Sequence, residues 1–265
     1  NAVYWLEILK ETTNDNIEVQ NITERAKNKV EKTQAIVEKD FIYPLIKGSD
    51  ISFWHFEYSN YIILPHSKTS KMYPINSEIL EKFPLTKKYF ELFKKDLQDR
   101  KGFTSFDKKI HIENYYALQR IGEYTFEPYK VAWRYIAKEF TPCVIEWVKD
   151  VYLGDRNSIP NEKVIYIGLS QRDEAYYLCG LLSSSIIREI INSFIVNIQI
   201  SPSTINNIKL VKFDKDNPNH KEISRLCYEG HSLKDKESQI KKIDANIKFV
   251  DLNNLTIFPS IIDSP

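Results

Sequence analysis

The sequence predicts an α+β fold, a mixed β-rich part with inserted helices followed by a helical C-terminal region. Three observations predict it. Short runs rich in Val, Ile, Tyr and Phe, bounded by Asn, Asp, Pro and Gly, recur in the first third of the chain. Apolar residues return at helical spacing after Pro84. From residue 173 onward, helical patterns replace most of the strand-like runs.

The first strands are predicted to form a hairpin. Residues 3–9 and 17–20 are strand-like, and the intervening segment 12–16 is rich in Thr, Asn and Asp, which tolerate the backbone angles of a tight turn. Two more strands are predicted at residues 41–46 and 61–64, because each is apolar and ends in turn-forming residues.

A helix is predicted to begin at Pro84, since proline is favoured at the first helical position. Its apolar stripe is expected to contain Leu85, Tyr89, Leu92 and Phe93. The opposite side then carries basic side chains, namely Lys87, Lys88, Lys94, Lys95 and Lys101.

Residues 129–134 alternate like a strand, with Val131 and Trp133 on one face. Lys130, Ala132 and Arg134 are expected on the other face. Further strands are predicted at residues 143–148, 164–167 and 208–213, and helices at residues 173–182, 185–195 and 218–243. The serines at 183–185 provide a cap between the first two of these helices.

Composition narrows the class of protein. The chain is 42% hydrophobic, yet it has no run of roughly 20 apolar residues that could cross a bilayer and no signal-peptide start. We therefore expect a soluble, cytoplasmic protein with no membrane partner. Cys143, Cys179 and Cys227 lie far apart, as expected for ordinary buried thiols. The abrupt start at Asn1 suggests a fragment.

Residues that carry catalysis are not apparent. The chain has seven glycines, no phosphate-binding or dinucleotide-binding turn, and no paired-proline motif for a flipped adenine. A metal-dependent nuclease needs an acidic residue and a lysine on the same face of a strand. In Glu127–Lys130 and Glu146–Lys149 the spacing puts the glutamate and the lysine on opposite faces. No metal site is expected, since the five histidines are dispersed: His55, His66, His111, His220 and His231.

Basic residues concentrate in the middle of the chain. Residues 61–140 hold 15 Lys and Arg against 10 Asp and Glu, whereas the remainder holds 22 against 26. Such a segment fits a face directed at a polyanion, because Lys and Arg displace counterions from phosphates. Solvated helices of any lysine-rich protein give the same pattern.

Several segments resemble one family when taken in order. Residues 37–54 combine a Pro-Leu pair, a Gly-x-Asp-Ile run and a tryptophan; segments 61–66, 115–118 and 129–134 come next, with the lysine-rich helix between the first two. Together, across about residues 37–147, they resemble the TaqI-like C-terminal specificity (target-recognition) domain of adenine-N6 DNA methyltransferases. Residues 176–184 and 199–210 resemble the segment after that domain in type IIG restriction-modification enzymes, and the closing element also resembles type I specificity subunits.

The resemblance implies a DNA target-recognition domain at residues 1–150. It also implies a C-terminal part at residues 151–265 that packs on that domain or on a methyltransferase domain absent from this chain. The parent protein would be a site-specific adenine DNA methyltransferase of a restriction-modification system, possibly fused to an endonuclease. Its N-terminal domain would bind S-adenosylmethionine, so no cofactor and no catalytic residue is expected in this fragment. Its partners would be double-stranded DNA and that domain.

A recognition domain positions itself on phosphates and offers a few side chains to base edges. Lys130 and Arg134, about 13 Å apart on one strand face at roughly 3.3 Å per residue, are suited to touch different points of one groove. The candidate DNA-binding residues are Lys47, Lys68, Lys87, Lys88, Lys94, Lys95, Lys108, Lys109, Arg120, Lys130 and Arg134.

Each assignment has an alternative. Arg134 can pair with Glu139 instead, and Trp54 and Trp133 fit a core better than a base-stacking platform. Tyr115 and Tyr116 fit either a DNA-facing loop or the core. The last helix is expected to be a solvated face or a docking helix. For the whole chain, the alternatives are a standalone metal-dependent nuclease and a specificity subunit that docks on a separate methyltransferase.

Overall fold

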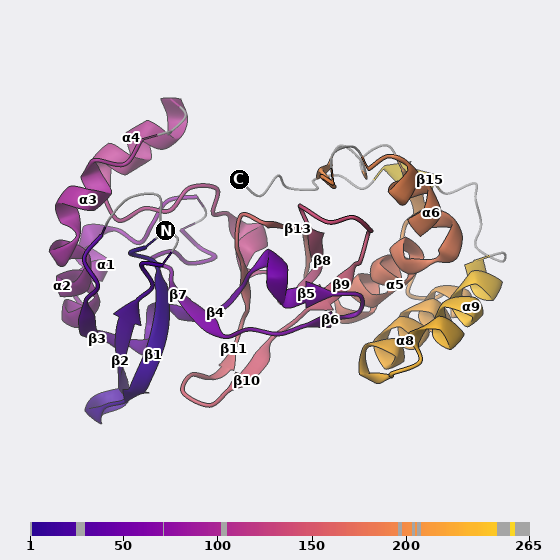
Figure 1. The fold of residues 1–265 in the computed structure, drawn as a ribbon, viewed down its shortest axis with the longest axis horizontal. Helices are drawn as coiled ribbons and strands as arrows, with labels where there is room; N and C mark the ends of the chain where they lie inside the picture. Colours follow the sequence, from indigo (N-terminus) through magenta and orange to yellow (C-terminus); the bar gives the residue numbers. More distant parts are fainter. Residues whose placement is uncertain are drawn as a thin grey trace. The chain divides into compact units, whose positions relative to one another are not determined.

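The structure is a computed structural model, and it describes residues 2–24, 30–70, 72–101, 105–195, 198–202, 205, 208–247 and 255–257. Its helices and strands confirm the predicted α+β class (Figure 1). The described chain forms two compact units, each built from several segments of the sequence. Unit 1 comprises Asn1–Leu45, Tyr58–Phe126 and Trp147–Ile159, and unit 2 comprises Ile46–Glu57, Glu127–Glu146 and Pro160–Pro265.

Unit 1 is built on a six-stranded sheet with the order β12-β4-β7-β1-β2-β3. The predicted hairpin is confirmed, because β1 and β2 pair antiparallel across a short 3-10 turn in which Asn14 and Asp15 have φ of 61°. Asn and Asp adopt this left-handed conformation more readily than most residues. The strands are β1 (Trp5–Glu11), β2 (Asn16–Asn21), β3 (Gln34–Glu38), β4 (Ile42–Ile46), β7 (Asn60–Ile63) and β12 (Ile159–Pro160).

Four helices belong to unit 1: α1 (Ser77–Leu80), α2 (Pro84–Leu92), α3 (Lys94–Gln98) and α4 (Ser105–Glu113). Helix α2 begins at Pro84 as predicted, and the Glu38 carboxylate accepts hydrogen bonds from the backbone N–H groups of Leu85 and Thr86 at 2.9 and 2.7 Å. This carboxylate satisfies two otherwise unpaired donors at the start of the helix. The predicted stripe is wrong at Leu92, which is 55% exposed, because Phe90 takes the core position instead.

The unit 1 core lies between the sheet and these helices. Tyr89, Phe90, Phe93 and Leu97 pack in one buried cluster with residues of the strands such as Leu6. Three tyrosine hydroxyl groups in this core donate to backbone carbonyls: Tyr4 donates to Tyr116 O at 3.0 Å, Tyr116 donates to Ile75 O at 2.8 Å, and Tyr89 donates to Val3 O. The helices are therefore tied to the N-terminal strand by polar as well as apolar contacts.

Unit 2 contains a three-stranded antiparallel sheet, β13-β8-β9, with helices packed against it. Its strands are β8 (Tyr129–Arg134), β9 (Cys143–Ile145) and β13 (Val164–Leu169); its helices are α5 (Arg172–Ser183), α6 (Ser185–Ser193), α8 (Pro218–Ser232) and α9 (Lys236–Ile247). Ser184 caps α6 as predicted, since its hydroxyl accepts from Ile187 N. The predicted helix at 218–243 is two helices, because the chain leaves helical geometry at Leu233.

The remaining elements are short. The run predicted as one strand at residues 143–148 divides between β9 of unit 2 and β10 of unit 1. The short strands are β5 (Ile51–Ser52), β6 (His55–Phe56), β10 (Val148–Asp150), β11 (Gly154–Arg156), β14 (Lys209–Val211) and β15 (Leu255–Ile257). The 3-10 helices are η1 (Thr13–Asp15), η2 (Lys39–Phe41), η3 (Gly48–Asp50) and η4 (Glu123–Phe126).

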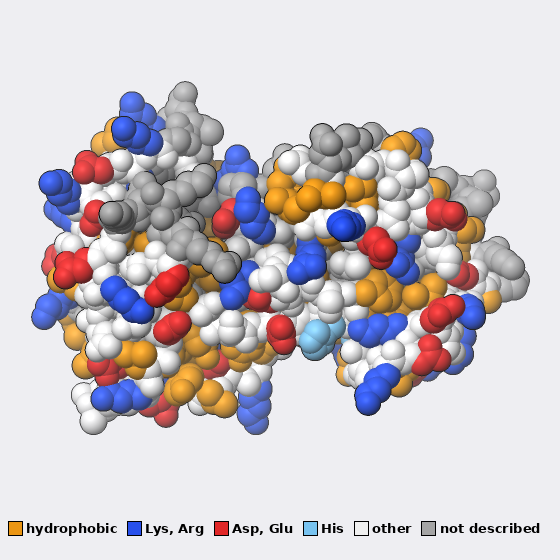
Figure 2. Space-filling model, viewed as in Figure 1, with side chains coloured by type: hydrophobic (Ala, Val, Ile, Leu, Met, Phe, Trp, Pro, Cys, Tyr) orange, Lys and Arg blue, Asp and Glu red, His pale blue; other side chains and the backbone are white. Residues whose placement is uncertain are grey.

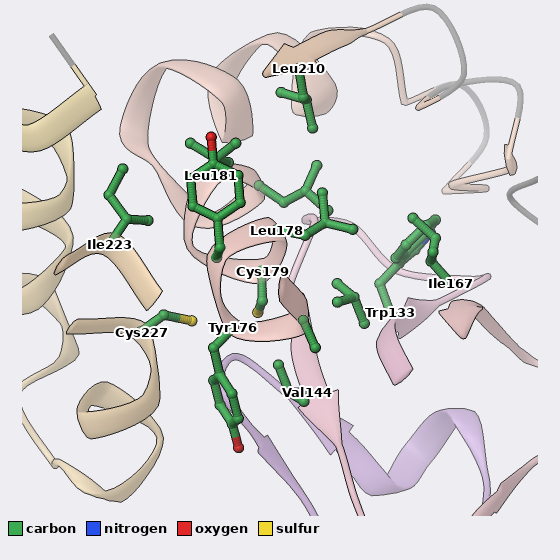
Figure 3. Packing of buried hydrophobic residues seen from close by; sticks show 14 of the residues in the cluster. Trp133, Val144, Ile167, Tyr176, Leu178, Cys179, Leu181, Leu210, Ile223 and Cys227 are labelled. Atoms are coloured by element: carbon green, nitrogen blue, oxygen red, sulfur yellow. The ribbon is translucent and has the colours of Figure 1, made fainter. Parts of the chain in front are cut away.

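Helix α5 is at the centre of the unit 2 core. Figure 3 shows its side chains between those of β8 on one side and those of α8 on the other. Gly180 allows α5 and α8 to approach closely, because a Cβ there would lie 2.8 Å from Ile223. Gly230 of α8 leaves room for the Trp54 ring, since a Cβ there would lie 2.1 Å from it. Trp54 and Trp133 are fully buried, so their core assignment is confirmed. All three cysteines are buried and free, as predicted.

Within the described part of the chain, no helix combines the length and the apolar character needed to span a bilayer.

Candidate nucleic-acid interface

The candidate DNA-binding residues are divided between the two units. Three of them, Lys47, Lys130 and Arg134, belong to unit 2, and each of these is engaged within that unit. The other eight belong to unit 1: Lys68, Lys87, Lys88, Lys94, Lys95, Lys108, Lys109 and Arg120.

Lys130 is inside unit 2 rather than on its surface. Its exposed fraction is 0%, and its Nζ donates to Glu127 O at 2.7 Å. Burial lowers the Lys130 pKa to about 7, against the opposing effect of the Glu127 carboxylate. The prediction of an outward face was wrong because strand β8 is central in its sheet and Ala132 is also fully buried. Lys130 is therefore not placed to contact a phosphate.

Arg134 and Lys47 stabilise a loop of unit 2. The Arg134 guanidinium donates from Nε to Gly48 O at 2.6 Å and from Nη2 to Ser49 O at 3.3 Å. Lys47 lies 3.8 Å from Asp50, whose carboxylate also accepts from the Lys47 backbone N–H at 3.0 Å. Arg134 thus binds backbone carbonyls in the structure, which is neither the base contact nor the ion pair with Glu139 considered from the sequence. The two-point contact by Lys130 and Arg134 is not supported.

A basic helical segment of unit 1 keeps its lysines at the surface. We call residues 82–101 the basic arm; they hold seven Lys and Arg against three Asp and Glu. Figure 2 shows Lys and Arg side chains over α2–α4, with acidic side chains among them. The buried residues of α2 and α3 recur at helical spacing, so the intervening positions face solvent.

Three lysines of the basic arm are the most available to a phosphate. Lys88, Lys94 and Lys95 are exposed, and among the described residues none of them has a carboxylate partner within ion-pair distance. Lys87 differs, because its Nζ lies 2.6 Å from Glu81 and 3.7 Å from Glu91. The predicted exposure of Lys88, Lys94 and Lys95 opposite the apolar stripe is confirmed.

The other candidates of unit 1 are also exposed but lie on other elements. Lys108 and Lys109 are on α4, and Lys68 and Arg120 are on loops. Arg120 has a φ of 55°, and its carbonyl accepts a hydrogen bond from the Tyr124 hydroxyl. The structure therefore places Lys88, Lys94 and Lys95 on the consecutive short helices α2 and α3, and the other candidates of unit 1 on other elements or, for Lys87, in ion pairs.

Arg100 anchors the basic arm, which was not anticipated from the sequence. Its guanidinium donates to Leu97 O at 3.0 Å, Tyr115 O at 2.7 Å and Ala117 O at 2.9 Å. It also lies 3.0 Å from His111 Nδ1. Burial, reinforced by the nearby positive charge of Arg100, lowers the His111 pKa, so the neutral ring accepts this contact. A guanidinium so fully engaged is structural.

The adjacent tyrosines have different roles. Tyr116 is buried and hydrogen-bonded, so it belongs to the core and not to a DNA-facing loop. Tyr115 is half-buried, and Lys94 Nζ lies 5.4 Å from the centre of its ring. This cation–π contact holds the Lys94 ammonium at the surface in a preferred position.

No protein-family model matches this chain, and no curated protein matches its sequence. In the described residues there is no group of three or more His, Cys, Asp or Glu side chains arranged to hold a metal ion. The functional assignment accordingly depends on the surfaces of the chain itself.

Proposed function

We propose that this chain is the target-recognition portion of an adenine-N6 DNA methyltransferase of a restriction-modification system, and that it binds duplex DNA. The observation that supports the proposal is that Lys88, Lys94 and Lys95 on α2 and α3 are exposed and, within the described part of the chain, have no carboxylate at ion-pair distance. In this proposal the base-flipping chemistry and the S-adenosylmethionine belong to a methyltransferase domain of the same polypeptide, which works in the cytoplasm.

The basic arm has the physical properties that phosphate binding requires. Each lysine that neutralises a phosphate releases condensed counterions, which favours binding at low salt. The lysines are on helices whose inner face is buried and whose end is fastened by Arg100. The backbone of the basic arm is already ordered before binding, so it loses little conformational entropy when DNA binds. The favourable free energy of counterion release is therefore not offset by a cost of ordering the backbone.

The test is a salt titration of duplex binding by fluorescence anisotropy, with the chain and a variant carrying Lys94→Ala and Lys95→Ala. We expect weaker binding to every duplex, whatever its sequence. We also expect the slope of log affinity against log salt to fall by about 1.8, since each lost phosphate contact removes about 0.9. Both side chains are exposed, and the lost cation–π contact of Lys94 with Tyr115 is worth only about 0.5–1 kcal/mol, so the thermal unfolding temperature should fall only slightly.

The matched control is Lys241→Ala with Lys242→Ala, two exposed lysines on α9 of unit 2. This variant should retain the wild-type salt slope. Equal slopes for the wild type and the variant at Lys94 and Lys95 would remove the basic arm from the interface. Absence of duplex binding at low salt, with tight binding to a methyltransferase subunit, would point to a docking subunit. Magnesium-dependent cleavage by the purified chain would point to a nuclease.

A further inference from the structure

A second surface of unit 1 is the hairpin formed by β10 and β11. The strands pair antiparallel, with Lys149 opposite Asp155 and Asp150 opposite Gly154. Residues 151–153 form the turn, which lies at the free end of the hairpin (Figure 1). None of the candidate residues predicted from the sequence belongs to this hairpin.

The turn is held by a buried carboxylate. Asp150 is 4% exposed, and its Oδ1 accepts from the backbone N–H groups of Tyr152 at 2.8 Å and Leu153 at 2.9 Å. Its Oδ2 accepts from the hydroxyl groups of Tyr58 and Tyr61, both at 2.8 Å. Burial and the Asp150 carboxylate raise the pKa of Tyr58 to about 12, so this hydroxyl remains a donor. Four hydrogen bonds thus fix the Asp150 side chain, which holds the start of the turn in place.

The backbone after the turn is also specialised. Gly154 has a φ of +69°, a conformation that favours glycine. A Cβ at this position would meet no atom within 4 Å, so glycine is required here by the backbone angle and not by crowding. Leu153 points into the unit 1 core and is 8% exposed. The turn is therefore anchored on both sides of its exposed residue.

That exposed residue is Val151. It is 84% exposed, the highest value among the large hydrophobic residues described. Val151 contributes most of the exposed apolar surface of the turn. Tyr152 beside it is only partly exposed and packs against the unit 1 core, Asp150 and Leu153 are buried, and Gly154 has no side chain. Trp147, which is 52% exposed, comes just before β10 and is four residues from Val151, about 13 Å at roughly 3.3 Å per residue.

A single apolar group on a rigid turn is a poor protein-docking surface. The fully buried core of a stable protein interface needs a contiguous apolar patch of several hundred Å². A thymine offers a much smaller partner, since its C5-methyl group projects into the major groove and is read by apolar contact. The major groove admits a two-stranded β-ribbon, and the hairpin is such a ribbon.

We propose that the β10–β11 turn enters the major groove and that Val151 reads the C5-methyl group of a thymine in the recognition sequence. This inference rests on the proposed function, because it requires that the chain binds duplex DNA. It adds a specificity-determining residue to the proposed interface. The lysines of α2 and α3 would contact phosphates and would not distinguish one base pair from another.

The experiment begins with selection of bound duplexes from a random-sequence pool, with the wild-type chain and with Val151→Ala. The wild type should select a sequence with a defined A·T pair whose preference disappears in the variant. At that pair, deoxyuridine in place of thymine should weaken wild-type binding about fourfold, the equivalent of one buried methyl group. Val151→Ala should bind the two duplexes equally.

The matched control is Ile36→Ala, which shortens an exposed apolar residue on strand β3 of unit 1. It should select the wild-type sequence and keep the fourfold response to deoxyuridine. Val151→Ala should also retain the wild-type affinity for random duplex, the wild-type salt slope and the wild-type unfolding temperature, because its side chain contacts solvent.

Failure of the Val151 inference and failure of the proposed function give different results in these experiments. If the wild type binds duplex DNA but deoxyuridine has no effect at any thymine of the selected sequence, the inference is overturned and the proposed function stands. The same holds if Val151→Ala selects an unchanged sequence. Duplex binding without any sequence preference would overturn both the inference and the proposed target recognition. If the wild type binds no duplex at low salt, both proposals fail.

Discussion

Lys130→Met is the substitution whose effect can be worked out most fully from the structure. Methionine is similar in length and carries no charge, so it fills the same buried space without an ammonium group. The ammonium is fully buried, and burial lowers its pKa from 10.5 to about 7. The folded chain therefore holds this proton less tightly than the unfolded chain does.

The direction of the pH dependence comes from this difference. The unfolded chain binds more protons than the folded chain between pH 7 and 10.5, so the wild-type free energy of unfolding rises with pH over this range. Below pH 7 both states are protonated, and the full destabilisation by the buried charge is present. At about 1.36 kcal/mol per pH unit, that destabilisation is at most roughly 4–5 kcal/mol, and about 2 kcal/mol of it is relieved between pH 7 and 9.

Lys130→Met should lose this pH dependence. At pH 7 we expect it to be more stable than the wild type by about 2 kcal/mol, because removal of the charge is partly offset by loss of the hydrogen bond to Glu127 O, worth about 1–3 kcal/mol. Urea unfolding at pH 7, 8 and 9, followed by tryptophan fluorescence, measures the effect. Trp54 and Trp133 report on the core of unit 2.

The informative quantity is the difference between the variant and the wild type, because it cancels the titration of other groups. Lys138→Met, at an exposed position of the same unit, is the matched control and should show no pH-dependent difference. A difference for Lys130→Met that stays constant from pH 7 to 9 would refute the argument that this ammonium loses its proton in the folded protein.

Three further substitutions test the packing and the interface. Gly230→Ala should destabilise unit 2 by about 1–3 kcal/mol, since its Cβ would overlap the Trp54 ring; an unchanged urea midpoint would contradict this. Glu38→Ala should lower stability by about 1 kcal/mol because α2 loses the acceptor for two backbone N–H groups, and equal thermal stability would count against that role. Asp96→Asn, at an exposed position of α3, should strengthen duplex binding at low salt; weaker binding in anisotropy titrations would oppose contact by the basic arm.

The sequence by itself determined the features that depend on neighbouring residues. The β1–β2 hairpin follows from its turn residues. Helix α2 begins where it does because of Pro84, and Ser184 caps α6. The exposure of Lys88, Lys94 and Lys95 results from helical periodicity. In each case the interactions that decide the outcome lie within one or two turns of chain, so a local pattern is sufficient.

Only the tertiary structure decided which surfaces are covered. Alternation placed Lys130 and Val131 on opposite faces of β8 correctly, but packing around the central strand buries both. The roles of Arg100 and Asp150 were likewise invisible, because their partners include residues as distant in sequence as Ala117 and Tyr58. Periodicity specifies the faces of an element, whereas burial depends on elements that the chain brings back from far away, and no local pattern contains that information.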